Sequence, residues 1–248
     1  MRRSCALALA ALALNSFTQA HTARGATIAP LSQTRSVSAR ALAVSAFGAD
    51  SMEDSAAASD YTRFDPNIAV SANAPLDLDG GGGASASAGA AQDSLILPNR
   101  IFGIGSALAD AFGTSGSSAQ GLATSLMSVT FTIDEAAPYR FDAFLGADKD
   151  VAPIGPSGMI SLIGPGGVLL SDSITAGQPT LEVSQEGVLE PGEYTLFVSI
   201  VADALYDEFT PANSGRVDFS AELVVIPEPA SFLLLASLLS LAARRRSA

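Results

Sequence analysis

The feature that most constrains the fold is a period-two alternation of apolar and polar residues that recurs through the middle of this 248-residue chain. Leu126–Ile133 places Val129, Phe131 and Ile133 on one side, and Tyr194–Val201 has the most regular alternation. Because successive side chains of a strand point to opposite faces, both segments predict strands with one buried face. The other predicted strands are 33–47, 61–64, 67–72, 84–96, 101–108, 139–145, 159–163, 168–170 and 216–226.

Turn-forming residues separate these segments. Pro98-Asn99 and Pro165-Gly166-Gly167 predict hairpin turns, and the Ala/Ser/acid-rich segment 50–60 predicts a loop. Residues 76–83, with Asp77, Asp79 and a run of glycines, predict a flexible loop, because an EF-hand needs further oxygen ligands at fixed spacing. Around ten short strands without an internal repeat predict an all-β fold: a single β-sandwich, jelly-roll-like, over residues 21–226.

Two segments of the chain support more specific predictions about the packing and the fold. The small alternating side chains of 84–96 predict a strand that another layer approaches closely. The segment Leu189-Glu-Pro-Gly-Glu-Tyr-Thr-Leu196 resembles an edge found in many bacterial extracellular β-sandwich domains. That resemblance implies a fold and says nothing of a function.

The first residues predict a secretory signal peptide with a helical apolar region. Met1-Arg2-Arg3 is basic, residues 5–14 are apolar, and Thr18-Gln19-Ala20 supplies small residues at the usual cleavage positions. We therefore expect residues 1–20 to be removed after Ala20, and residues 21–226 to lie outside the cytoplasm.

The last residues predict a membrane-spanning helix over 230–243. Pro227, Glu228 and Pro229 precede its uncharged run, and Arg244, Arg245 and Arg246 follow it. Arginines in this position stop translocation and stay in the cytoplasm. The run is about 21 Å long as a helix, shorter than the ~30 Å hydrocarbon core. That length suits a transient anchor, and a permanent anchor that thins the bilayer is the alternative.

The order Pro-Glu-Pro-Ala-Ser, Leu/Ala helix and Arg cluster over 227–248 resembles the PEP-CTERM sorting signal of Gram-negative bacteria. The resemblance implies that an exosortase-like membrane transpeptidase reads the tail and cuts it near Pro227, Glu228 and Pro229. It also implies delivery to the cell surface or the exopolysaccharide matrix. The same kind of segment is also named an ice-binding-protein C-terminal domain, but nothing in these residues suggests ice binding.

Composition excludes several kinds of function. The chain has 13 basic and 25 acidic residues and a net charge of −12, so it has no basic stripe for nucleic acid. Its only cysteine, Cys5, lies in the predicted signal peptide, and its only histidine is His21. Ser-His-Asp and Cys-His catalysis therefore lack a base, and histidine or cysteine metal sites lack ligands. We predict no metal and no cofactor.

What remains for catalysis is a pair of carboxylates of the glycosidase type. Asp148 with Asp150, and Glu190 with Glu193, are predicted to lie in solvated loops or turns. We therefore predict no catalytic residue, and a non-enzymatic surface or matrix protein that binds polysaccharide or builds extracellular structure. The alternative is a carbohydrate-active hydrolase, which would need two acids in a groove lined by aromatics. The chain has no tryptophan, so Tyr and Phe would have to contact the sugar.

Overall fold

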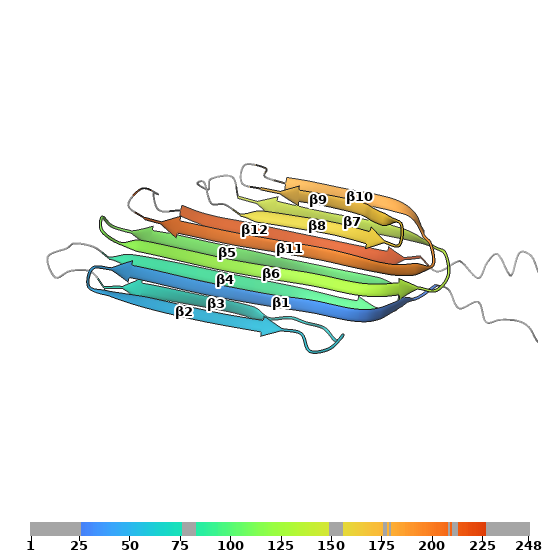
Figure 1. Cartoon of the computed structure of the whole chain (residues 1–248), viewed down its shortest axis with the longest axis horizontal. Helices are drawn as coiled ribbons and strands as arrows, with labels where there is room; N and C mark the ends of the chain where they lie inside the picture. The colour runs from blue at the N-terminus through green and yellow to red at the C-terminus, as the bar shows by residue number, and fades with distance from the viewer. Residues whose placement is uncertain are drawn as a thin grey trace, which may run out of the picture.

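The computed structural model describes residues 26–75, 83–148, 156–175, 178, 180–207, 209 and 213–226. These residues form two six-stranded antiparallel sheets that stack face to face, with the strands along the long axis of the molecule (Figure 1). The described part contains no helix, so the all-β prediction is confirmed. The strands are β1 (Ile28–Ser45), β2 (Gly48–Ala57), β3 (Asn67–Ala74), β4 (Ala84–Leu97), β5 (Arg100–Gly113), β6 (Ser118–Ile133), β7 (Ala137–Ala147), β8 (Ser157–Gly164), β9 (Gly167–Ile174), β10 (Thr180–Leu189), β11 (Gly192–Tyr206) and β12 (Asn213–Val225).

The chain moves repeatedly between the two sheets. Sheet A has the strand order β2-β1-β6-β11-β8-β9, and sheet B has the order β10-β7-β12-β5-β4-β3. The central strands of both sheets pair with partners that are distant in sequence, such as β1 with β6 and β12 with β5. Residues that are far apart in the chain therefore share one face.

Every predicted strand except 61–64 is present, and many are longer than expected. Two predictions were wrong. Segment 50–60, predicted as a loop, contributes most of β2, which pairs with β1 along its whole length. Because β2 is an exposed edge strand, it has no buried face to impose an apolar alternation. Its acids Asp50, Glu53 and Asp54 are the kind of charge that protects a sheet edge. Segment 61–64, predicted as a strand, makes only an isolated bridge between Phe64 and Ser94.

The core between the sheets changes in side-chain size along the strands. At one end, around β1, β4, β5 and β6, the buried residues are mainly alanines, among them Ala41, Ala43, Ala86, Ala88, Ala109, Ala111, Ala119 and Ala123. Toward the other end the core contains large side chains, among them Ile101, Met127, Phe131, Ile133, Phe141, Leu196 and Leu223. The predicted small-residue strand 84–96 is β4, which faces this alanine end.

Gly121 of β6 shows how closely the sheets approach at the alanine end. A Cβ atom added to Gly121 would lie against the carbonyl oxygen of Ser87 and 3.0 Å from the carbonyl oxygen of Asp110. Both of these are backbone atoms of the opposite sheet. The prediction that another layer comes close to 84–96 is therefore confirmed.

The resemblance noted at Leu189–Leu196 corresponds to a tyrosine corner. The Tyr194 hydroxyl donates to the carbonyl oxygen of Glu190 at 2.7 Å, and its ring stacks on Phe131 with a centroid distance of 5.6 Å. A Cβ at Gly164 would lie 2.6 Å from the Tyr194 ring, and one at Gly192 would collide with Pro165. The corner therefore packs directly against the β8–β9 hairpin, as in other β-sandwich domains.

Both ends of the described body are bonded to one turn. The Ile28 N–H donates to the carbonyl oxygen of Pro98, and the Val225 N–H donates to that of Asn99 at 2.9 Å. The two residues therefore lie at the same end of the sandwich, where β1 begins and β12 ends (Figure 1).

The predicted segments at the chain ends are not covered by this description. The signal peptide 1–20 and the tail 227–248 lie outside the described residues, as does loop 76–83 except for Gly83. Within the described part, we find no helix with the length and hydropathy that crossing a bilayer requires.

Candidate functional site on the outer face of sheet B

The sequence-predicted sorting residues cannot be placed by the structure. Ala20, the proline–glutamate–proline motif and the terminal arginines all lie outside the described residues; these are Ala20, Pro227, Glu228, Pro229, Arg244, Arg245 and Arg246. Of the acid pairs, Asp148 is exposed just after β7, and Asp150 is outside the description. Glu190 is exposed in the turn before β11, and Glu193 is exposed on β11 itself. The prediction of a solvated loop or turn is confirmed for Glu190, whereas Glu193 is solvated but lies on a strand.

The outer face of sheet B carries a row of apolar side chains along its central strand β5. Phe102, Ile104, Leu108 and Phe112 point outward from alternate positions of this strand, and the last three are 41%, 44% and 50% exposed. Phe144, which is partly exposed, lies on the same face two strands away, on β7.

Ion pairs lie beside these apolar residues. Arg140 Nε donates to Asp142 Oδ2 at 2.6 Å on β7, and Arg216 Nε donates to Asp218 Oδ2 at 3.0 Å on β12. Arg100 Nε on β5 lies 2.7 Å from Glu222 Oε1 on β12. The two groups form an ion pair, but the N–H group does not point at the carboxylate oxygen closely enough for a hydrogen bond. The side chains of these pairs are about one-third to three-fifths exposed, so solvent screens them and each adds little to stability.

Three shallow hollows adjoin one another on this face. The first, of about 510 Å³, is bordered by Phe102 and Phe144 and by three acids, Asp142, Glu182 and Glu222. The second, of about 240 Å³, begins at Phe102 and continues to Asp93 and Arg63. The third, of about 550 Å³, shares Asp93 and is lined by Ile104, Arg216 and Asp218. Together they extend across the strands from β10 to β4.

Asp142 and Glu222 form a carboxylate pair in a groove with aromatic sides. They are register partners on the adjacent strands β7 and β12, so their Cβ atoms lie about 5 Å apart. The hydrogen bond from Arg140 lowers the pKa of Asp142, with a smaller contribution from Ser184. A glycosidase requires one carboxylic acid whose pKa is raised, which is the opposite direction. Both carboxylates of this pair are bound to arginines in the structure.

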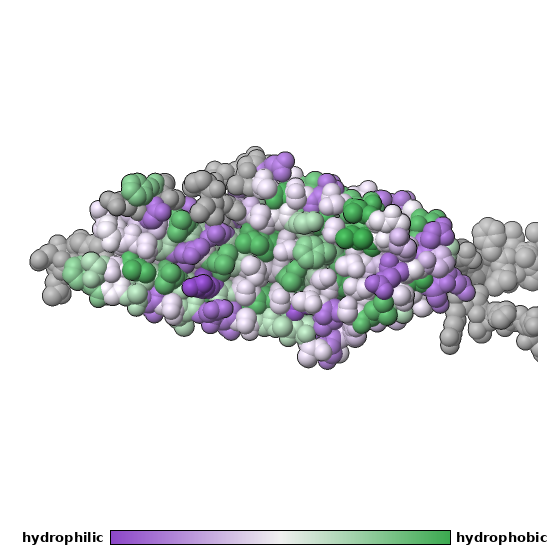
Figure 2. Space-filling model, viewed as in Figure 1, coloured by the Kyte–Doolittle hydropathy of each residue, from purple (hydrophilic) through white to green (hydrophobic). Residues whose placement is uncertain are grey.

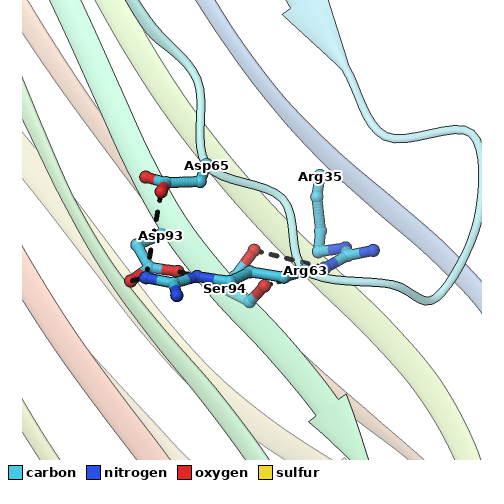
Figure 3. Close-up of polar contacts among 5 residues, drawn as sticks. All are labelled: Arg35, Arg63, Asp65, Asp93 and Ser94. Atoms are coloured by element: carbon cyan, nitrogen blue, oxygen red, sulfur yellow. Dashed lines mark hydrogen bonds and ion pairs between the residues drawn. The ribbon is translucent and has the colours of Figure 1, made fainter.

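A second polar feature, which we call the arginine clasp, lies at the margin of sheet B and consists of Arg35, Arg63, Asp93 and Ser94 (Figure 3). Asp93 and Ser94 are neighbours on β4, so one side chain points outward and the other points into the core. Arg63 binds Asp93 from the outside, with Nε donating to Oδ1 at 2.8 Å. Arg35 reaches Ser94 from β1 on the inside.

Arg35 is fully buried between the sheets. Its Nη1 donates to the Ser94 carbonyl oxygen at 3.2 Å, its Nη2 to the carbonyl oxygen of Asp60, and its Nε to Gln33 Oε1 at 3.0 Å. Its guanidinium also lies 5.8 Å from the centre of the Phe64 ring. Burial lowers the pKa of Arg35, and the carboxylate of Asp60 partly opposes that shift. The side chain remains charged, because an arginine does not lose its proton in a protein.

The clasp attaches the connection between the two sheets, residues 58–66, to both faces of β4. Arg63 belongs to this connection, and Asp60 and Phe64 contact Arg35. The hydrogen bonds that Arg63 donates to Asp93 raise the pKa of Arg63 and hold it against β4. We therefore assign the clasp a structural role, in which it fixes the chain where it passes from β2 to β3.

The alternation in the sequence indicated that Arg35 is buried, although a charged residue is usually expected at the surface. In segment 33–47 the alternation places Arg35 on the same side as Val37 and Ala39, which is the buried side. A charged residue in register with a buried stripe has to find hydrogen-bond partners inside the protein. The neighbouring polar residues Gln92, Ser94 and Ser125 are buried in the same region.

Comparisons with known proteins do not identify this chain, since no protein-family model and no curated protein matches it. Among the described residues, no group of three or more His, Cys, Asp or Glu side chains is placed to hold a metal ion. Figure 2 shows hydrophobic and hydrophilic residues interleaved over the face in view.

Proposed function

We propose that this protein is a non-enzymatic component of the cell surface or extracellular matrix of a Gram-negative bacterium. The observation that carries the proposal is the tail, in which Pro227-Glu228-Pro229, an apolar run and Arg244-Arg245-Arg246 occur in the order of a PEP-CTERM signal. A signal peptide ending at Ala20 exports the chain, and a helix over 230–243 holds it in the inner membrane. An exosortase-like transpeptidase then cuts near the proline–glutamate–proline motif.

In this proposal the body, residues 21–226, binds polysaccharide or builds matrix structure, and its strand connections are jelly-roll-like. Two features support a binding role. The chain forms an extended sandwich with broad outer faces, and the outer face of sheet B combines aromatic side chains with hydrogen-bonding groups in shallow hollows. The acidic balance of the chain gives no support for a nucleic-acid partner.

A second candidate function is hydrolysis of a carbohydrate by a carboxylate pair. The observation that favours it is the direct pairing of Asp142 with Glu222 in the hollow beside Phe102 and Phe144. The lowered pKa of Asp142 argues against this residue as the catalytic acid. Release of reducing ends from the host exopolysaccharide, abolished by both Asp142→Asn and Glu222→Gln, would establish hydrolysis and overturn the non-enzymatic proposal.

The sorting proposal is tested by the intact mass of the protein recovered from the membrane and extracellular fractions of its host. We expect an extracellular form that begins at His21 and ends near Pro227–Pro229. Retention of Arg244–Arg246 on a protein that stays with the inner membrane would show that the tail is a plain anchor. Handling by an exosortase would then be wrong, and a periplasm-facing binding role would replace it.

A further inference from the structure

We propose that the outer face of sheet B binds an uncharged, extended polysaccharide that lies across the strands, over Phe144 and Phe102. The inference rests on the polysaccharide-binding role proposed above and assigns to it a surface and a ligand class. The binding surface, which we call the transverse site, consists of Phe102, Phe144, Arg100, Glu222, Arg140 and Asp142.

The aromatic side chains of the transverse site are suited to the apolar faces of sugar rings. Phe144 and Phe102 both border the 510 Å³ hollow, and the backbone strand β12 lies between their strands. The alternation of β5 places the Phe102 ring on the outer face, and Arg100 lies over this ring, 5.2 Å from its centre. A sugar ring presents C–H groups above and below its plane, and an amphipathic ligand of this kind packs on aromatic surface while its hydroxyls remain solvated.

The ion pairs of the transverse site present donors and acceptors side by side. An arginine carries five N–H donors in a planar fork and a carboxylate accepts at both oxygens, so neighbouring hydroxyls of one ring can bind both. Arg140 uses Nε for Asp142, and its terminal nitrogens donate no hydrogen bond within the described part of the chain. Arg140 is 57% exposed and Asp142 is 37% exposed, so a ligand on the surface can reach both.

The charges of this face favour an uncharged ligand. Each of its arginines already faces a carboxylate, as Arg140 faces Asp142 and Arg100 lies beside Glu222. Glu182, which borders the same hollow, adds a further negative charge. An anionic polymer would therefore be repelled, because every arginine described on this face lies beside an acid.

The distribution of charges also argues against a protein partner. A protein interface typically has a core depleted of charged residues and a polar rim. Here the carboxylates of Asp142 and Glu222, each beside an arginine, line the hollow together with the two phenylalanines. Hydroxyl groups distributed along a sugar chain match this alternation better than an apolar protein surface does.

The size of the hollows indicates an extended ligand. The hollows continue across five neighbouring strands, from β10 through β7, β12 and β5 to β4. Four steps between strands at ~4.8 Å each give a length of ~19 Å, which accommodates several linked sugar rings. A single monosaccharide would fill only part of this line.

The test is affinity electrophoresis of the extracellular protein in gels that contain host exopolysaccharide, separated by anion exchange into neutral and acidic fractions. We expect the neutral fraction to retard the wild type, and the double variant Phe102→Ala/Phe144→Ala to lose about ten-fold or more in affinity. Phe197→Ala is the matched control, because Phe197 is a partly exposed aromatic on the outer face of sheet A. It should bind as the wild type does. All variants are first compared by thermal unfolding, and Arg140→Gln with Asp142→Asn provides a second test that leaves the aromatics in place.

The outcomes separate this inference from the proposed function. If the wild type binds the neutral fraction and the sheet B variants bind equally well, the transverse site is wrong and polysaccharide binding stands. Binding of only the acidic fraction would overturn the assignment of an uncharged ligand. If the wild type binds neither fraction, the polysaccharide-binding role itself fails. Size-exclusion chromatography completes the test, because a dimer that the Phe102/Phe144 variant dissociates would make a second copy of the chain the occupant.

Discussion

Replacement of Gly121 by alanine tests the close approach of the two sheets. The added methyl group would lie against the Ser87 carbonyl oxygen, 3.0 Å from the Asp110 carbonyl oxygen and 3.1 Å from the Asp110 nitrogen. All three atoms belong to the backbone of sheet B, where β4 and β5 are paired along their length. They cannot rotate away as a flexible side chain would, so the sheets have to separate locally.

The expected loss of stability follows from two opposing effects. Overpacking a rigid site lowers the free energy of unfolding by about 1–3 kcal/mol. Alanine also restricts the unfolded chain, which raises the free energy of unfolding by about 0.4–1 kcal/mol. Because the nearest contact is with backbone, we expect the upper part of that range and a net loss of about 2 kcal/mol. For a domain of this size, that corresponds to a fall in melting temperature of about 4–8 °C.

The assay is urea unfolding, in which the midpoint should fall while the slope stays unchanged. Gly89→Ala is the matched control, because Gly89 lies on β4 and a Cβ there would meet the Ile68 carbonyl oxygen at 3.4 Å and the Ala69 Cβ at 3.8 Å, ordinary contact distances. We expect Gly89→Ala to leave the free energy of unfolding within about 0.5 kcal/mol of wild type. Equal stability of the two variants would refute the conclusion that the sheets approach closely at Gly121.

Three further predictions concern the clasp and the tyrosine corner. Arg35→Met removes the inner attachment of segment 58–66, so hydrogen exchange at the Phe64 amide should accelerate about ten-fold. The control variant Arg40→Met, at an exposed position, should not change this rate. Equal exchange rates in the two variants would show that Arg35 does not hold the segment. Tyr194→Phe removes the hydroxyl bond of the corner and should lower the free energy of unfolding by about 1 kcal/mol in urea, and no loss would contradict a role for that bond. Burial raises the pKa of both Tyr194 and Tyr139, so the folded state holds these protons more tightly than the unfolded state. The contribution of these two tyrosines to the free energy of unfolding should therefore be constant below pH ~10 and fall as the pH rises above it. The fall should be less steep in Tyr194→Phe, and an unchanged slope would exclude this tyrosine as its source.

Period-two patterning predicted the strands that have one buried face, because burial imposes the alternation. Tyr194–Val201 and Leu126–Ile133 both lie inside central strands of sheet A. The pattern failed for β2, where Asp50 and Glu53 lie on an edge without a buried face. It also gave shorter strands than the structure has, because the Ala- and Ser-rich extensions carry little difference in hydropathy.

The candidate site could not be predicted, because its members come from strands that are neighbours only in the fold. Phe102, Asp142 and Glu222 lie on β5, β7 and β12, and the strand order of sheet B brings them together. Hydropathy patterns carry neither strand order nor register between distant segments. Arg35 is the intermediate case, since the alternation placed it on the buried side but could not supply its partner on β4.

The attachment of Ile28 and Val225 to one hairpin turn has a consequence for export. In the proposed route, the leader holds the front of the chain at the bilayer and the tail later holds the back. Since both ends of the sandwich leave from one side, the body can complete its folding while it is tethered at either end or at both. The sandwich would then stand upright on the membrane, with the tip formed by the turn at 114–117 held about 50 Å out by the 16 residues of β6.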